Sequence, residues 1–257
     1  MRKKIYFASD AHFGLSGPDE SQPRERLFAK WLDTVRKDAG EVYLLGDIFD
    51  FWFEYKRVVP RGFTRVLGKI AEITDSGIPV HFITGNHDLW IFDYLPAETG
   101  AVIHRDPLVR EFSGKRFYLA HGDGLDHKEK GFLLLKRIFA SRSLQWLFAR
   151  LHPNFAMWFA HRWSRHSRYS RELVTPFRGE DREQQIIFAN RVLEKEHFDF
   201  FVFGHRHIPL DVPLKNGVSR YINTGDWLWH FSYAVFDGEK MEVREFGPAK
   251  DLCKGLS

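Results

Sequence analysis

Five short runs of apolar residues recur along the chain, and each ends at a glycine or at a cluster of polar residues. β-Branched and aromatic side chains dominate these runs, which favours extended, mostly buried strands. The predicted strands are KIYFASD (4–10), EVYLLGD (41–47), PVHFITGN (79–86), RFYLAHGD (116–123) and FDFFVFGH (198–205).

Helical periodicity fills two of the gaps between these strands, over 24–40 and 63–77, and both segments end in glycine, a common helix stop. The first half of the chain therefore alternates strand and helix, which is typical of an α/β fold. Residues 231–246 predict a hairpin that turns at Asp237-Gly238, which adds antiparallel strands.

Residues 125–172 depart from this alternation and predict two helices with a break near His152-Pro153. Their apolar positions exceed the single stripe of an amphipathic helix. These positions are Leu133, Leu134, Leu135, Ile138, Phe139, Leu144, Trp146, Leu147, Phe148, Leu151, Phe155, Met157, Trp158, Phe159 and Trp163. We interpret the segment as a helical insertion into one α/β domain that spans 1–257.

The composition is that of a protein with a packed core. Of the 257 residues, 44% are hydrophobic and 16% aromatic, which argues against global disorder. The lone cysteine, Cys253, excludes an internal disulfide and is typical of a reducing compartment. The apolar run after the basic start is too short for a signal peptide, and no segment has the length of a membrane span.

The positive charge of the chain is concentrated in the predicted insertion. The formal net charge is +4, yet residues 130–171 contain nine basic residues and no Asp or Glu. The rest of the chain, with 29 basic and 34 acidic residues, has a net charge of −5. One interpretation is a helical hairpin whose basic face is merely solvated. The alternative is a surface for an anionic partner, because basic segments attract phosphates and anionic membranes.

Metal-ligand side chains follow all five predicted strands. Because ligands gather at the carboxyl ends of strands in α/β sheets, these residues are expected to converge although they span about 200 positions. The candidates are Asp10, His12, Asp47, Asn86, His87, Asp88, His121, His205 and His207. Each cluster alone would be compatible with a capped turn or a structural histidine, but five in order predict a site.

The mixture of carboxylate, imidazole and amide oxygen is typical of Mn²⁺, Fe or Zn²⁺ sites without thiolates. Residues two apart, such as Asp10 and His12, point to the same side of an extended chain, and a carboxylate such as Asp47 can bridge two ions. Two such ions would hold a phosphoryl group and activate a water. Among the other histidines, His127 is a candidate substrate contact and the rest are interpreted as structural.

These motifs, D-x-H, GD-x-x-D, GNHD, a later H-G and GH-x-H, resemble the calcineurin-like metallophosphoesterases from Asp10 to His207. The resemblance implies a sandwich of two mixed β-sheets flanked by helices, with two metals at one edge. It assigns Asp47 to both metals, and His87 to the substrate, oriented by Asp88. It assigns the remaining ligands as Asp10, His12 and His207 for the first metal, and Asn86, His121 and His205 for the second.

Within this superfamily, SDAHFG, LGDIFDFWFEY and the basic, apolar insertion resemble the UDP-2,3-diacylglucosamine diphosphatases of lipid A synthesis. That resemblance implies Mn²⁺-dependent cleavage of an acylated UDP-sugar to UMP and a lipid monophosphate. It also implies a lid over the acyl chains and a cytoplasmic enzyme at the inner face of the cytoplasmic membrane. The basic residues of the lid would bind phosphates or headgroups, with Arg162, Arg165 and Arg168 as candidates.

One position departs from that pattern, because the better-known diphosphatases have Arg where this chain has His87. A pyrophosphate expels phosphate, whose charge Arg can neutralise, whereas an ester expels an alkoxide, which benefits from a protonated His. A phosphodiesterase or nucleotide phosphatase therefore stays an alternative. A non-catalytic binding protein is disfavoured because all seven ligand positions hold competent residues. A nucleic-acid partner is not expected, since Leu, Phe and Trp interrupt the basic segment.

Overall fold

The computed structural model describes residues 3–15, 18–125, 138–169 and 176–247. Six strands form a first, mixed sheet in the order β11-β10-β1-β2-β3-β4. β1 to β4 run parallel, and β10 and β11 add the antiparallel edge. The strands are β1 (Lys4–Ala8), β2 (Ala39–Leu44), β3 (Val80–Ile83), β4 (Val102–His104), β10 (Ser232–Phe236) and β11 (Met241–Glu245).

Five strands form a second mixed sheet in the order β5-β6-β7-β9-β8. Its three central strands are parallel, and an antiparallel strand closes each edge. The strands are β5 (Leu108–Phe112), β6 (Lys115–Leu119), β7 (Phe200–Phe203), β8 (Pro209–Pro213) and β9 (Arg220–Thr224).

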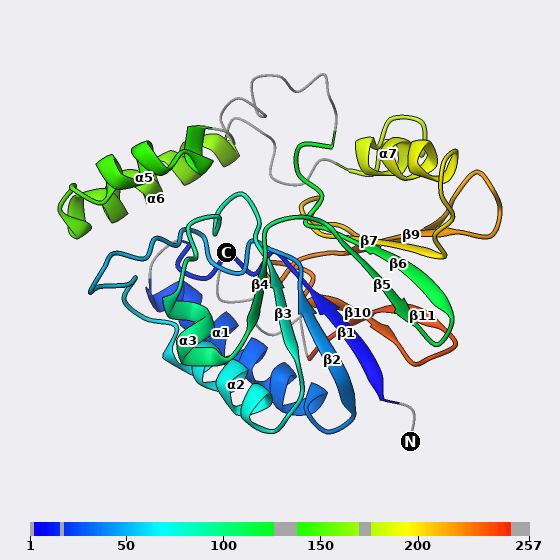
Figure 1. Cartoon of the computed structure of the whole chain (residues 1–257), viewed down its shortest axis with the longest axis horizontal. Helices are drawn as coiled ribbons and strands as arrows, with labels where there is room; N and C mark the ends of the chain where they lie inside the picture. Colours follow the sequence, from blue (N-terminus) through cyan, green and yellow to red (C-terminus); the bar gives the residue numbers. More distant parts are fainter. Residues whose placement is uncertain (1–2, 16–17, 126–137, 170–175, 248–257) are drawn as a thin grey trace.

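The two sheets face one another, and helices cover their outer faces (Figure 1). One buried cluster fills the space between the sheets, with Phe7 and Phe117 stacked across it. Two further clusters lie under the flanking helices, one on each sheet. The helices are α1 (Pro18–Val35), α2 (Thr64–Asp75), α3 (Tyr94–Thr99) and α7 (Gln184–Leu193). The predicted sandwich of two mixed sheets is therefore confirmed.

All five predicted strands and the C-terminal hairpin are present, but the first predicted helix has different bounds. Instead of spanning 24–40, α1 begins at Pro18, whose fixed φ suits the first turn of a helix, and ends at Val35. Gly40 lies in β2 rather than at a helix stop. A Cβ there would lie 2.7 Å from Cβ of Lys3, so the glycine permits close approach to the strand beside it.

Two helices from the predicted insertion, α5 (Arg142–Phe148) and α6 (Pro153–Tyr169), form an arm beyond the carboxyl ends of the strands (Figure 1). α5 ends at Phe148 and α6 begins at Pro153, so the break lies next to the predicted position at His152-Pro153. The arm contacts the body through aromatic rings. The ring centroid of Phe148 lies 4.8 Å from that of Phe53 and 4.7 Å from that of Trp90. The Trp90 indole also donates a hydrogen bond to the carbonyl of Phe139 at 2.7 Å.

Among the described residues, none of the helices combines the length and the apolar character that crossing a bilayer requires.

Candidate metal centre

The carboxyl ends of β1, β2, β3, β6 and β7 deliver the predicted ligands to one edge of the sandwich. Eight non-glycine residues of the described chain have positive φ, and five of them are predicted ligands. These five are Asp10, His12, Asp47, His205 and His207, with φ from 44° to 69°. Left-handed backbone costs a non-glycine residue roughly 1–3 kcal/mol, and such strain collects at functional sites. The backbone of these turns therefore lowers the stability of the fold, and in return it orients these side chains toward one another.

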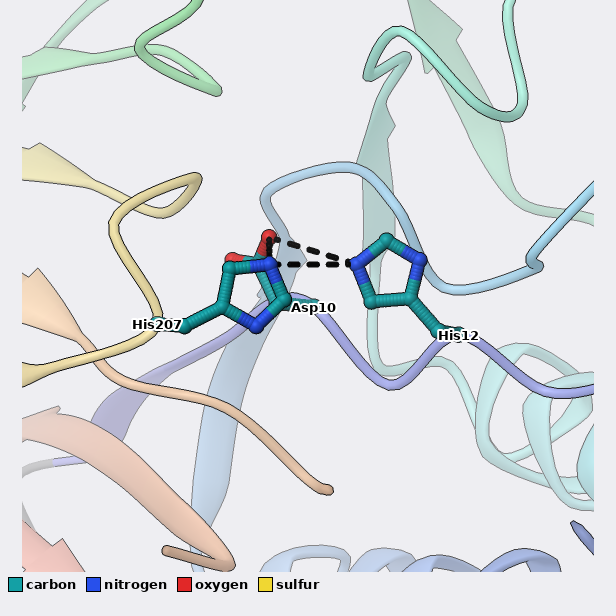
Figure 2. Close-up of side chains that lie close together, drawn as sticks. All are labelled: Asp10, His12 and His207. Atoms are coloured by element: carbon teal, nitrogen blue, oxygen red, sulfur yellow. Dashed lines mark hydrogen bonds and ion pairs between the residues drawn. The ribbon is translucent and has the colours of Figure 1, made fainter. Parts of the chain in front are cut away.

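Asp10, His12 and His207 form the first cluster (Figure 2). The two imidazole rings are stacked, with Nε2 of His12 3.3 Å from Nε2 of His207. Oδ1 of Asp10 lies 3.4 Å from Nε2 of His207 and 3.8 Å from Nε2 of His12. Three ligand atoms from β1 and β7 thus face a common point.

Asp47, His121 and His205 form the second cluster. Nε2 of His121 lies 3.3 Å from Oδ2 of Asp47 and 3.2 Å from Nδ1 of His205. The same Asp47 oxygen lies 3.8 Å from Nε2 of His12, in the first cluster. Asp47 therefore lies between the clusters, where a bridging carboxylate is expected.

Two buried oxygens support the fit of these residues to metal ions. Oδ1 of Asp10 and Oδ1 of Asn86 accept no hydrogen bond, although burial without a partner is costly for a polar atom. Nitrogen ligands that share an ion at about 2.1 Å each lie about 3 to 3.5 Å apart, as these imidazoles do. The donor set of carboxylate, imidazole and amide oxygen fits divalent ions.

The surroundings of the two central carboxylates shift their pKa values in opposite directions. Burial raises the pKa of Asp10, and the nearby charge of Asp47 raises it further, against the opposing effect of His207 and His121. Burial would also raise the pKa of Asp47, but the His121 and His87 imidazoles hold it well below its usual range. A divalent cation between these carboxylates would stabilise both as anions.

The two histidines of the second cluster also differ. Burial alone would lower the pKa of His121, but Asp47 raises it well above its usual value. For His205, burial and the His121 charge both lower the pKa, to about 3. Nδ1 of His121 lies 2.8 Å from the carbonyl oxygen of Leu45 and donates to it, so Nε2 is the nitrogen that faces Asp47.

His87 and Asp88 lie at the site but not in the expected relation. Nδ1 of His87 donates to the carbonyl oxygen of Asp50 at 2.8 Å. The buried Asp88 carboxylate instead accepts hydrogen bonds from the amides of Gly85 at 2.7 Å and Ile48 at 2.9 Å. This corrects the expectation that Asp88 orients the imidazole, because its oxygens join two loops. Burial, and then the Asp47 charge, raise the pKa of Asp88 to about 7.

The structure gives partial information on the predicted substrate contacts. Arg162 is exposed on α6, with its guanidinium carbon 6.0 Å from the ring centre of Trp158. Arg165 and Arg168 belong to the same helix, but their side chains lie outside the described part of the chain, as does the whole of His127.

Asp226 and Asp50 are two site residues that we did not predict. Asp226 follows β9 in the sequence NTGDW, and Asp50 ends the GDIFD motif. Oδ1 of Asp50 lies 3.7 Å from Nδ1 of His12, and Oδ2 of Asp226 lies 3.4 Å from Nδ1 of His207. The glycine-aspartate pair after an extended run was the available signal for Asp226, since the same pair, Gly46-Asp47, follows β2.

Gly85 provides a test of this packing. A Cβ added there would lie 2.6 Å from the backbone nitrogen of Asp47, closer than real contacts allow. Gly85→Ala is therefore expected to lower the free energy of unfolding by about 1–3 kcal/mol, measured by urea denaturation. Gly68→Ala, with no atom within 4 Å of the new Cβ in α2, is the control and should be neutral or stabilising. Equal stability of the two variants would contradict this packing.

Fold and site together define a metal-dependent phosphoesterase. The family model of calcineurin-like phosphoesterases matches residues 3–209. The chain belongs to the calcineurin-like phosphoesterase family.

Curated relatives extend the comparison beyond the family model. A UDP-2,3-diacylglucosamine hydrolase of Porphyromonas gingivalis is 41% identical over 95% of this chain and 100% of that protein. A hydrolase of the same name from Aeromonas hydrophila is 29% identical over 86% of this chain and 89% of its own. A solved phosphoesterase from E. coli, 16% identical, covers 97% of this chain and 94% of its own with a TM-score of 0.46.

Proposed function

We propose that the protein hydrolyses the pyrophosphate of UDP-2,3-diacylglucosamine to UMP and 2,3-diacylglucosamine 1-phosphate. The observation that carries this proposal is the 41% identity to a hydrolase of that substrate over the whole of the relative. The convergence of carboxylates and imidazoles at the strand ends is consistent with such a reaction, because phosphoryl transfer depends on positioning and charge neutralisation.

The site would hold two divalent ions, and Mn²⁺ is our proposed metal. Asp10, His12, Asp47 and His207 would bind the first ion, and Asp47, Asn86, His121 and His205 the second. When bound, the ions would neutralise the phosphoryl oxygens and activate the attacking water. The strained ligand turns hold these side chains in place before the ions arrive.

His87 lies at the rim of the site, where it would contact the scissile group. Its ring packs edge-on against that of His12, with centroids 4.9 Å apart, and its backbone amide donates to Oδ1 of Asp47 at 2.9 Å. Because Nδ1 donates to the Asp50 carbonyl, Nε2 is the nitrogen that would exchange a proton with the substrate. Asp88 would support this loop through the backbone.

We also propose that α5 and α6 form a lid for the acyl chains within one domain, and that the lid contacts the cytoplasmic membrane surface. Apolar side chains on these helices are unusually exposed, including Trp146 (60%), Leu147 (57%) and Trp158 (55%). The guanidinium carbon of Arg150 lies 4.4 Å from the ring centre of Trp146. Such pairing of arginines with exposed aromatic rings suits a boundary between acyl chains and anionic headgroups.

The lid proposal predicts a substrate-dependent loss. Replacing Trp146 and Trp158 together with Ser should lower binding to anionic phospholipid vesicles at least about tenfold, measured by co-sedimentation. Turnover of the acylated substrate should fall, while turnover of a small chromogenic diester stays unchanged. Val218→Ser, on the equally exposed β8–β9 turn, is the control. Equal losses on both substrates would count against a lid.

The proposed function is tested by Mn²⁺-dependent hydrolysis of UDP-2,3-diacylglucosamine beside UDP-N-acetylglucosamine. We expect UMP release from the acylated substrate and little from the unacylated one. Because His87 also suits ester cleavage, a general phosphodiesterase is the second candidate. Rapid cleavage of chromogenic diesters without preference for the acylated UDP-sugar would favour that candidate.

A further inference from the structure

Asp226 is a buried carboxylate at the same edge of the sandwich as the ligands. It lies two residues after β9, the neighbour of β7, and its side chain is inaccessible to solvent. Oδ1 accepts hydrogen bonds from the backbone amides of Trp229 and His230, both at 2.9 Å, and of Leu228 at 3.2 Å. One carboxylate oxygen is therefore fully used in holding the turn that follows β9.

The second oxygen of Asp226 faces a predicted metal ligand. Oδ2 is buried, accepts no hydrogen bond from the described residues, and lies 3.4 Å from Nδ1 of His207, slightly beyond the usual range of about 2.7–3.2 Å for an N–H···O hydrogen bond. The opposite ring nitrogen, Nε2, lies 3.4 Å from Oδ1 of Asp10. One ring nitrogen of His207 therefore faces a buried carboxylate, and the other faces the ligand cluster. Histidines that bind metals often have a carboxylate next to the nitrogen that does not bind the metal.

We propose that Asp226 is a positioning residue, which keeps the proton of His207 on Nδ1 so that Nε2 presents its lone pair to the first metal. A carboxylate only accepts hydrogen bonds, so the tautomer with a proton on Nδ1 is the one it favours. The carbonyl oxygen of Leu45 likewise accepts a hydrogen bond from Nδ1 of His121, which leaves the lone pair of that ring on Nε2. The inference rests on the proposed metal site, but it does not depend on the substrate.

Asp226→Asn separates this role from support of the turn. Three amide donors converge on Oδ1, so the asparagine oxygen must take that place and still accept them. Its NH₂ group then faces Nδ1 of His207 as a donor, which favours the tautomer with the proton on Nε2. That tautomer has no lone pair on Nε2, the nitrogen that would bind the metal, and the same wrong tautomer results in other sites where Asn replaces an orienting Asp.

Asp237→Asn is a matched control. Asp237 also supports a turn, that between β10 and β11, because its exposed carboxylate accepts hydrogen bonds through Oδ1 from the amides of Glu239 at 2.9 Å and Lys240 at 2.8 Å. It lies in the distant hairpin of the first sheet. Asp237→Asn should therefore leave both the His207 tautomer and the Mn²⁺ affinity unchanged.

The test measures the His207 tautomer by ¹⁵N NMR in metal-free protein and Mn²⁺ affinity by calorimetry. We expect a proton on Nδ1 in the wild type and on Nε2 in Asp226→Asn, a 10- to 100-fold weaker first Mn²⁺ site, and an unchanged Tm. A retained Nδ1 proton, wild-type affinity, or no Mn²⁺ binding by the wild type would each overturn the inference. A wild type that binds Mn²⁺ and shows the tautomer but leaves UDP-2,3-diacylglucosamine intact would refute only the proposed function.

Discussion

Replacement of Asp47 by asparagine is expected to lower turnover by about three orders of magnitude or more and to remove metal from both clusters. Asp47 is the only predicted ligand shared by the two sets, and its Oδ2 lies near both His121 and His12. The side-chain oxygen of an asparagine of the same size should still accept the hydrogen bond from the backbone amide of His87, which Oδ1 of Asp47 accepts at 2.9 Å in the wild type. The loss should therefore come from charge and not from collapse of the loop.

The measurement for Asp47→Asn combines kcat in saturating Mn²⁺ with metal content by mass spectrometry. Asp181→Asn, whose side chain is 86% exposed beside Lys215, controls for loss of a carboxylate and should leave both quantities unchanged. Circular dichroism verifies that each variant is folded. Wild-type metal content with normal turnover in Asp47→Asn would remove the bridging assignment.

Substitution of His87 by alanine is expected to lower kcat by about 10²- to 10⁴-fold, the usual contribution of a positioned acid or base. The loss should be greatest for substrates with a poor leaving group, since these need a proton most. His87→Arg should preserve much of the activity on a pyrophosphate, because a fixed positive charge stabilises departing phosphate. The same variant should lose activity on alkyl phosphodiesters.

A series of phosphodiesters with leaving groups of increasing pKa measures this dependence. His197→Ala, at an imidazole that is 56% exposed before β7, serves as the control. The steepness of the rate against leaving-group pKa should increase in His87→Ala and stay the same in the control. An identical slope in wild type and His87→Ala would mean that His87 gives no proton to the leaving group.

The convergence of the ligands could be predicted because the strands that deliver them are simple in sequence. β7 consists of four buried residues, Phe200 to Phe203, and β1 has one half-buried position followed by four buried ones. Such continuous apolar runs predict strands in the centre of a sheet, buried on both faces. The polar residues that follow them therefore lie at the carboxyl end of each strand. The hydrophobic pattern therefore predicts that these polar side chains lie together at one edge of the sheet.

Asp226 escaped prediction because β9 does not look like a buried strand. Its sequence, RYINT, contains Asn223 and Thr224, which are both fully buried. Asn223 donates to the Gly204 carbonyl at 2.6 Å, and the hydroxyl of Thr224 lies 2.7 Å from that of Ser9. Tertiary hydrogen bonds that satisfy polar side chains in a core leave no periodic signal in the sequence.

The partners of His87 were also beyond prediction from the sequence. Adjacent residues in a turn suggest a local pair, yet Asp88 bonds to the amide of Ile48, 40 positions away. The acceptor for the His87 ring is a main-chain oxygen, that of Asp50, and any residue type could provide it. Only the three-dimensional arrangement of the loops after β2 and β3 reveals which groups meet.

The most direct test of the dinuclear site is a Mn²⁺ titration of metal-free protein, followed by electron paramagnetic resonance with turnover of UDP-2,3-diacylglucosamine in parallel. We predict two ions per chain, a spin-coupled signal from ions that share Asp47, and activity that rises with occupancy of the pair. Full activity with a single, uncoupled ion, or without metal, would contradict the account.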